Sequence, residues 1–382
     1  MATSERSMSN GILSVTSESN GTLSITDLRS GQTYQRLLTF EDRADIGDGW
    51  YHGIAANDQT FLSSASSANI AMVHNGPLLT TFRIRTIMSL PAEFDFTAMQ
   101  RSAKTSDLVI DSLISLRRGS DRIEVETKVH NTVGDHRLRV LFPTGVQTDT
   151  FLTDTPFDVV ERRIALSPEN HLYRELEVET RPQQTWSAIY HQPRGLAVVS
   201  TGLMEVAVQD LPERPVALTL FRSTRRTVFT EGEPLGQLFG DLTFSYWILP
   251  LATEPDRTAL CNMGQALAAG VRIIQMSAVD VKNNRLKDNL PLSASFLKVE
   301  GPVVLTSLRE VENGMEVRMF NPNLTPVKAR LDFSGQPAIA RRLNNARQVD
   351  FESHPTGPVN EFDGKVFPVE LGPKQILTLR FE

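Results

Sequence analysis

Apolar and polar residues alternate along most of the chain, and a period of two residues predicts β-strands. The alternation is clearest at Ile123, Val125 and Val129, which are separated by polar side chains. Asn20-Gly21, between two short alternating runs, is typical of a β-hairpin turn. We expect strands at residues 12–15, 22–26, 34–40, 82–88, 108–116, 123–129, 138–142, 174–178, 187–190, 196–199, 204–208, 216–221 and 242–249.

The pattern changes near residue 254. Residues 254–267 predict one short helix, with Pro255 near its start and Leu260, Met263 and Leu267 on one face. A second series of alternating runs follows at residues 303–308, 315–320, 327–333, 366–371 and 376–381. So many strands without intervening helices favour an all-β, antiparallel sandwich over a parallel α/β fold.

The break between the two strand series predicts two domains. We place a leader or an engineered boundary at residues 1–9, a large β-domain at residues 10–282 and a smaller β-sandwich at residues 283–382.

Composition narrows the class of protein. The chain has 382 residues with 45 acidic and 39 basic side chains and no basic block, so nucleic acid is not an expected partner. Cys261 is the only cysteine, which excludes an internal disulfide and a cysteine-built zinc site, and we expect a buried thiol. No apolar run is long enough to span a membrane and the first ten residues contain no secretory signal, so we expect a cytoplasmic protein without a membrane partner.

The residues most suited to chemistry gather in residues 39–53, TFEDRADIGDGWYHG. Carboxylates beside aromatic rings favour a sugar site, because hydroxyls bind charged acceptors and the apolar face of a sugar packs on a ring. The relevant side chains are Glu41, Asp42, Asp45, Asp48, Trp50, Tyr51 and His52. Four carboxylates within eight residues are poorly placed to flank a scissile bond, and turn capping or pairing with Arg43 is the alternative. A metal site on Asp45, Asp48 and His52 would lack a closing ligand.

A second group of polar residues precedes a glycine-rich turn. Arg222, Arg225 and Arg226 could bind vicinal hydroxyls through paired N–H groups, although three arginines can also form a solvated surface. Elsewhere, the histidines do not have zinc-ligand spacing, and no nucleophile elbow, phosphate loop or dinucleotide fingerprint occurs.

Several segments, in this order, resemble the C-terminal β region of the glycoside hydrolase family 38 α-mannosidases. They are Asn20-Gly21 with Leu23, residues 27–34 (DLRSGQTY), Phe40-Glu41-Asp42 followed by Gly47-Asp48 and Tyr51, residues 122–125 (RIEV), 129–131 (VHN), 141–143 (LFP), 217–222 (ALTLFR), 295–297 (SFL) and 317–322 (VRMFNP).

The resemblance implies a β-supersandwich like that of galactose mutarotase, followed by a smaller β-sandwich. It also implies a parent enzyme that is a zinc-dependent, retaining α-mannosidase, with its nucleophile and zinc ligands in an N-terminal catalytic domain. This chain would then need no cofactor of its own and would be inactive alone. Its partners would be that domain and a mannose-containing carbohydrate, and a homo-oligomer is a further expectation.

In that family the β region lends an aromatic residue and an arginine to the edge of the substrate site. The resemblance therefore implies substrate contacts by Asp45, Asp48, Trp50, Tyr51, Arg222, Arg225, Arg226 and Gln237. Trp50 and His52 depart from the residues usual in the family. Two alternatives stay open: a stand-alone carbohydrate-binding protein that uses the loop from Glu41 to His52, and a mutarotase-like enzyme with an acid and a base facing one cleft.

Overall fold

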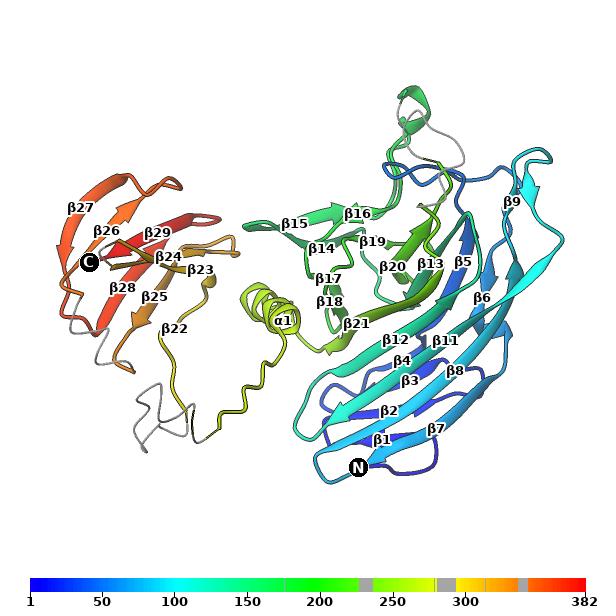
Figure 1. Ribbon diagram of the computed structural model, residues 1–382, viewed down its shortest axis with the longest axis horizontal. Helices are drawn as coiled ribbons and strands as arrows, with labels where there is room; N and C mark the ends of the chain where they lie inside the picture. Colours follow the sequence, from blue (N-terminus) through cyan, green and yellow to red (C-terminus); the bar gives the residue numbers. More distant parts are fainter. Residues whose placement is uncertain (175, 227–235, 278, 280–292, 313, 336–342) are drawn as a thin grey trace. The chain divides into compact units, whose positions relative to one another are not determined.

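The computed structural model describes the whole chain except residues 175, 227–235, 278, 280–292, 313 and 336–342 (Figure 1). Strands make up 51% of the residues and helices 6%, so the predicted all-β sandwich fold is confirmed. The chain forms two compact units, Met1–Thr153 with Val160–Pro255, and Asp154–Val159 with Asp256–Glu382.

The first unit is built from antiparallel sheets. One has the order β1(Ser7–Ser9), β2(Leu13–Ser17), β3(Leu23–Asp27), β4(Thr33–Leu37). A nine-stranded sheet runs β15(Asp158–Arg163), β14(Thr150–Thr155), β17(Trp186–His191), β18(Arg194–Ser200), β21(Gly240–Leu251), β12(Ile123–Asn131), β11(Thr105–Arg117), β8(Leu79–Pro91), β7(Ala68–Asn75). A six-stranded sheet runs β16(Arg181–Pro182), β19(Glu205–Val208), β20(Val216–Ser223), β13(His136–Phe142), β5(Thr39–Ala44), β6(Phe61–Leu62). Short elements complete the unit: β9(Phe94–Asp95) paired with β10(Gln100–Arg101), and the 3-10 turns η1(Ser63–Ala65) and η2(Asn170–Leu172).

The period of two decides which side chains enter the main core. Along β12 the inward residues alternate with exposed or half-buried ones, as the sequence predicts. The Asn20-Gly21 hairpin is also confirmed: Gly21 has φ +85°, and a Cβ there would lie 2.9 Å from the Cβ of Ala68. Glycine is therefore required by both backbone conformation and space.

Three details differ from the sequence predictions. Ser7–Ser9, assigned to a leader, form β1, and Met8 is fully buried. Ala68–Asn75 form β7, which is not among the expected strands, because most of this edge strand is exposed and carries little apolar alternation. The strand predicted at residues 174–178 is wrong for the described residues of that range: Glu177 instead accepts the backbone N–H of Ser167 and pairs with Arg181, which favours a loop.

Strand β13 has both faces buried. Leu138, Val140 and Phe142 enter the main core. Arg137, Arg139 and Leu141 lie on the opposite side, which we call the outer face of the six-stranded sheet. By register, this face also carries Thr39, Glu41 and Arg43 from β5, Glu205 and Ala207 from β19, and Ala217, Thr219 and Arg222 from β20.

The second unit contains the helix α1(Arg257–Ala269). The Asp256 side chain caps it by accepting the backbone N–H of Ala259 at 3.0 Å, which explains why it begins after Pro255. Cys261 is buried, as expected. The buried stripe is Thr258, Leu260, Cys261 and Gly264, whereas Met263 and Leu267 are only half-buried.

The other strands of this unit form two antiparallel sheets. They have the orders β22(Lys298–Glu300), β25(Val327–Asp332), β28(Val366–Leu371) and β23(Val304–Val311), β24(Gly314–Phe320), β29(Ile376–Phe381), β26(Asn345–Val349), β27(Pro355–Glu361). The predicted domain boundary at residues 282 and 283 lies outside the described residues, and the compact units change at Pro255 and Asp256. Among the described helices, none has the length and apolar character needed to cross a membrane.

Candidate functional site

The loop that follows β5 is held by its own carboxylates. Asp45 Oδ1 accepts the backbone N–H groups of Gly47 at 3.0 Å and Gly53 at 3.1 Å. Asp48 Oδ1 accepts those of Trp50 at 2.8 Å and Tyr51 at 3.0 Å. These bonds are typical of turn-forming aspartates, so the capping interpretation is confirmed for both residues.

Arg222 reaches this loop from the outer face of the sheet. Its Nε donates to Asp45 Oδ2 at 2.6 Å, and its Nη2 donates to the carbonyl oxygens of Asp48 and Tyr51, each at 2.7 Å. The Asp45 side chain is fully buried. Asp45 and Arg222 therefore fix the loop from within, and a direct substrate contact by either residue stays a prediction.

Trp50 and Tyr51 are presented outward by the same loop. Trp50 is 86% exposed and Tyr51 is 45% exposed, which is unusual for aromatic side chains on a rigid turn. With Arg222 they line a pocket of about 230 Å³, which we call the rim pocket. Its other lining residues are His52, Val178, Thr180, Arg181, Pro182, Met204 and Glu205.

Arg225 and Gln237 converge on Asp135 instead. Arg225 Nε donates to Asp135 Oδ1 at 2.9 Å, and Gln237 Nε2 donates to the same oxygen at 2.6 Å. Asp135 Oδ2 accepts the N–H of Phe94 at 3.1 Å, and the Asp135 carbonyl oxygen accepts the N–H of Asp45 at 2.8 Å. Asp135 thus bonds the loop after β5 through its carbonyl oxygen, and Phe94, Arg225 and Gln237 through its buried carboxylate.

Arg226 lies against an aromatic ring, with its guanidinium carbon 4.3 Å from the centroid of the Phe96 ring. Arg225, Arg226 and Gln237 do not line the rim pocket, so their predicted sugar contacts stay predictions. Asp135 is not among the site residues predicted from the sequence. Its only local signal is the preceding Gly134, which indicates a turn, and its partners are 90 to 102 residues away for Arg225 and Gln237.

The remaining two carboxylates of the stretch lie within β5. Strand alternation directs Glu41 to the outer face, where it accepts from Arg139 Nε at 2.7 Å, and Asp42 to the inner face. Asp42 pairs with Arg101 and His136 there, and all three side chains are buried. Of the alternative that these carboxylates cap turns or pair with Arg43, the pairing is not observed, because Arg43 pairs with Asp58 at 2.9 Å.

His52, which is only 8% exposed, lines the rim pocket. Burial lowers its pKa to about 4, and the nearby positive charge of Arg137 acts in the same direction. The imidazole is therefore neutral at pH 7, with Nε2 3.3 Å from the carbonyl oxygen of Ala44. In the described part of the chain, no group of three or more His, Cys, Asp or Glu side chains is placed to hold a metal ion.

We predict that Asp135→Asn destabilises the first unit by about 2 kcal/mol, because Arg225 and Gln237 would face an amide that cannot accept all of their hydrogen bonds. Asparagine tolerates the positive φ of +52° at this position, so the loss reports on the carboxylate. Urea unfolding would measure it. The matched control, Asp241→Asn, removes an exposed carboxylate and should change stability by less than about 0.5 kcal/mol. Equal effects of the two changes would contradict this prediction.

We also predict an acid-sensitive contribution from His52. The unfolded chain takes up a proton below about pH 6.5 and the folded chain only near pH 4, so the free energy of unfolding falls as pH decreases through that window. The loss attributable to His52 is at most about 3 kcal/mol. His52→Gln should flatten the dependence of stability on pH between these values, and His74→Gln, at an exposed position, should not. Identical pH profiles for wild type and His52→Gln would count against this assignment.

Comparison with known proteins places these features in a family. The profile of the glycosyl hydrolases family 38 C-terminal domain matches residues 8–227. An alpha-mannosidase from Enterococcus faecalis is 26% identical, with a TM-score of 0.85 over 99% of this chain and 42% of that chain. A protein in glycosyl hydrolase family 38 from the same organism is also 26% identical, with a TM-score of 0.82 over 99% of this chain and 44% of that chain.

A protein from Halalkalibacterium halodurans, provisionally named a mannosylglycerate hydrolase, is 23% identical over 391 aligned residues, covering 93% of this chain and 39% of that protein. The chain thus spans about two fifths of the length of these relatives. The family profile covers more than half of the 382 residues and agrees with the resemblance seen in the sequence. The chain belongs to glycosyl hydrolase family 38, as its C-terminal domain.

Proposed function

We propose that this chain is the non-catalytic C-terminal β portion of a zinc-dependent, retaining α-mannosidase. The observation that supports this most strongly is the match of 99% of the chain to 42% of an alpha-mannosidase, with a TM-score of 0.85. The nucleophile and the zinc ligands then lie in an N-terminal catalytic domain of the same parent protein. Among the described residues of this chain, no group of three or more His, Cys, Asp or Glu side chains could hold a zinc ion.

The role of the chain is to supply one edge of the substrate site. Trp50 and Tyr51 offer aromatic surface to the apolar face of a mannose ring. Arg181 and Glu205 in the same pocket offer a donor and an acceptor to sugar hydroxyls. Because Asp45 and Arg222 already fix the backbone of the loop, little conformational entropy is lost when the rim contacts a substrate.

The chain alone should neither bind zinc tightly nor hydrolyse aryl α-mannosides, because the catalytic groups are assigned to another domain. Calorimetric titration with zinc and a chromogenic α-mannoside assay would measure both. Asp48→Asn serves as the control variant, since the Asp48 carboxylate accepts the backbone N–H groups of the exposed Trp50 and Tyr51. Turnover above background that disappears in Asp48→Asn would overturn the proposal.

In the intact enzyme, Tyr51→Ala and Arg226→Ala should each raise KM about tenfold or more, with a change in folding stability of less than about 1 kcal/mol. Tyr51 is 45% exposed, so truncation removes little core packing. Steady-state kinetics and thermal unfolding of the same preparations test this, with Tyr51→Phe as the variant that keeps the ring. Unchanged kinetic constants in both alanine variants would refute the predicted contacts.

The mutarotase-like alternative has one supporting observation, since His52 and Glu205 line the same pocket. However, a pKa of about 4 makes His52 a weak general base at neutral pH. Glu205 also accepts a hydrogen bond from the Thr219 hydroxyl at 2.7 Å. NMR measurement of anomer exchange in mannose would detect this activity, and we expect the uncatalysed rate.

A further inference from the structure

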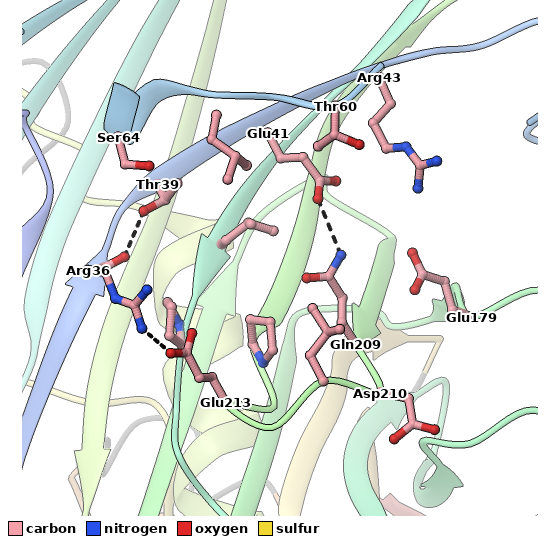
Figure 2. Close-up of a pocket in the computed structure, with 15 residues that line it drawn as sticks. Arg36, Thr39, Glu41, Arg43, Thr60, Ser64, Glu179, Gln209, Asp210 and Glu213 are labelled. Atoms are coloured by element: carbon pink, nitrogen blue, oxygen red, sulfur yellow. Dashed lines mark hydrogen bonds and ion pairs between the residues drawn. The ribbon is translucent and has the colours of Figure 1, made fainter. Parts of the chain in front are cut away.

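A second pocket, larger than the rim pocket, lies on the outer face of the six-stranded sheet (Figure 2). Its volume is about 560 Å³, within the range of small-molecule sites. Thr39, Glu41 and Arg43 from β5 lie on one side, and Gln209 and the turn that follows it lie across from them. We call it the outer-face pocket. It shares no lining residue with the rim pocket, and the segment around Glu179 borders both.

The charges that line the outer-face pocket are compensated by neighbouring side chains. Glu41 and Glu179 both pair with the buried Arg139. The two carboxylates of the turn are also paired, Asp210 with Arg214 and Glu213 with Arg36. A pocket in which each carboxylate has an arginine partner exerts little net field on a ligand. It therefore favours an uncharged polar ligand over an ion.

Hydrogen-bonding groups remain available in the pocket. Gln209 is only 8% exposed. Its Nε2 donates one long hydrogen bond, of 3.3 Å, to Glu41 Oε2. Within the described residues, Gln209 Oε1 has no hydrogen-bond partner, and neither do the hydroxyls of Thr60 and Ser64 or the terminal nitrogens of Arg43. In Figure 2, Thr60 and Ser64 lie along one wall and Gln209 lies opposite. Donors and acceptors thus face each other across the cavity.

The same pocket has an apolar patch. Leu141, Pro143 and Pro215 lie beside the exposed side chain of Leu211, which is 52% accessible. Leu141 packs on Ala207 and Ala217, so this part of the floor is fixed by three strands. A pyranose ring has one face of C–H groups and an edge of hydroxyls. The apolar floor of the pocket matches the C–H face, and its uncharged polar groups match the hydroxyls.

We propose that the outer-face pocket is a second carbohydrate-binding site, which takes an uncharged oligosaccharide independently of the rim pocket. Gln209, Thr60 and Ser64 bind hydroxyls, and Leu141 and Leu211 pack against a ring face. Leucine and proline offer less surface than aromatic residues, so the affinity is in the millimolar range, about 1 mM. Such a site would hold a neighbouring part of the glycan chain on the enzyme.

The test titrates the 382-residue chain with α-mannobiose, by calorimetry or saturation-transfer NMR. Leu211→Trp fills the pocket from an exposed position and should weaken binding at this site at least about tenfold, as should Gln209→Ala, which removes the buried amide. Leu78→Trp, at an exposed leucine in a turn outside both pockets, is the matched control and should bind as wild type does. Trp50→Ala should leave this binding intact, which separates the outer-face pocket from the rim pocket.

Two results would overturn the proposal. One is the absence of saturable binding at mannobiose concentrations up to about 10 mM, ten times the expected dissociation constant. The other is binding that persists in Leu211→Trp and is lost in Trp50→Ala, which would assign the sugar to the rim pocket. Circular dichroism and thermal unfolding check that each variant is folded, and Leu211→Trp alone carries the test if Gln209→Ala is unstable. Since the readout is binding, failure of the proposed enzymatic role does not affect it.

Discussion

The structure of the first unit depends on the compensation of charges buried where β5 pairs with β13. Arg139 is fully buried, and burial alone would lower its pKa, but the carboxylates of Glu41 and Glu179 outweigh this and raise the pKa of Arg139. On the inner face, Asp42 is paired with Arg101 and His136. Removing Arg139 would leave the buried Glu41 carboxylate without its ion-pair partner, and breaking a buried pair in this way costs several kcal/mol, about 3–5.

Arg137, also on β13, is less well compensated by carboxylates than Arg139 is. Its nearest carboxylates are Glu205 at 3.6 Å and Glu179 at 3.9 Å, longer than the bonds that Arg139 makes. Burial and the neighbouring charge of Arg139 lower the pKa of Arg137 to about 10. Arg137 stands between the two pockets on the outer face, and its charge also helps to keep His52 neutral. Burial is the larger cause of the lowered pKa of His52, and the buried charge of Arg137 adds to it.

Hydrogen bonds from residues at the end of this sheet fix the loops around the rim pocket. Arg222 on β20 bonds the loop that carries Trp50 and Tyr51, and Asp135 beside β13 bonds both that loop and the segment with Arg225 and Gln237. Residues predicted to bind substrate thus divide into two kinds. The side chains of Trp50 and Tyr51 are exposed at the surface and can contact a ligand. The side chains of Asp45, Arg222, Arg225 and Gln237 form hydrogen bonds that position the loops. A rim held in this way is preorganised for a ligand.

The sequence by itself determined the all-β class, the hairpin at Gly21, the presence of a helix near Pro255 and the family, because these depend on local alternation, on turn residues and on ordered short segments. It also predicted a site at residues 39–53, a stretch rich in carboxylates and aromatic side chains. Only the tertiary structure separated the roles of those side chains. Strand alternation turns Glu41 and Asp42 to opposite faces, and the partners that decide their roles, Arg139 and His136, are 98 and 94 residues away. Long-range pairing of buried charges leaves no local signal, and so neither Asp135 nor the outer-face pocket could be found in the sequence.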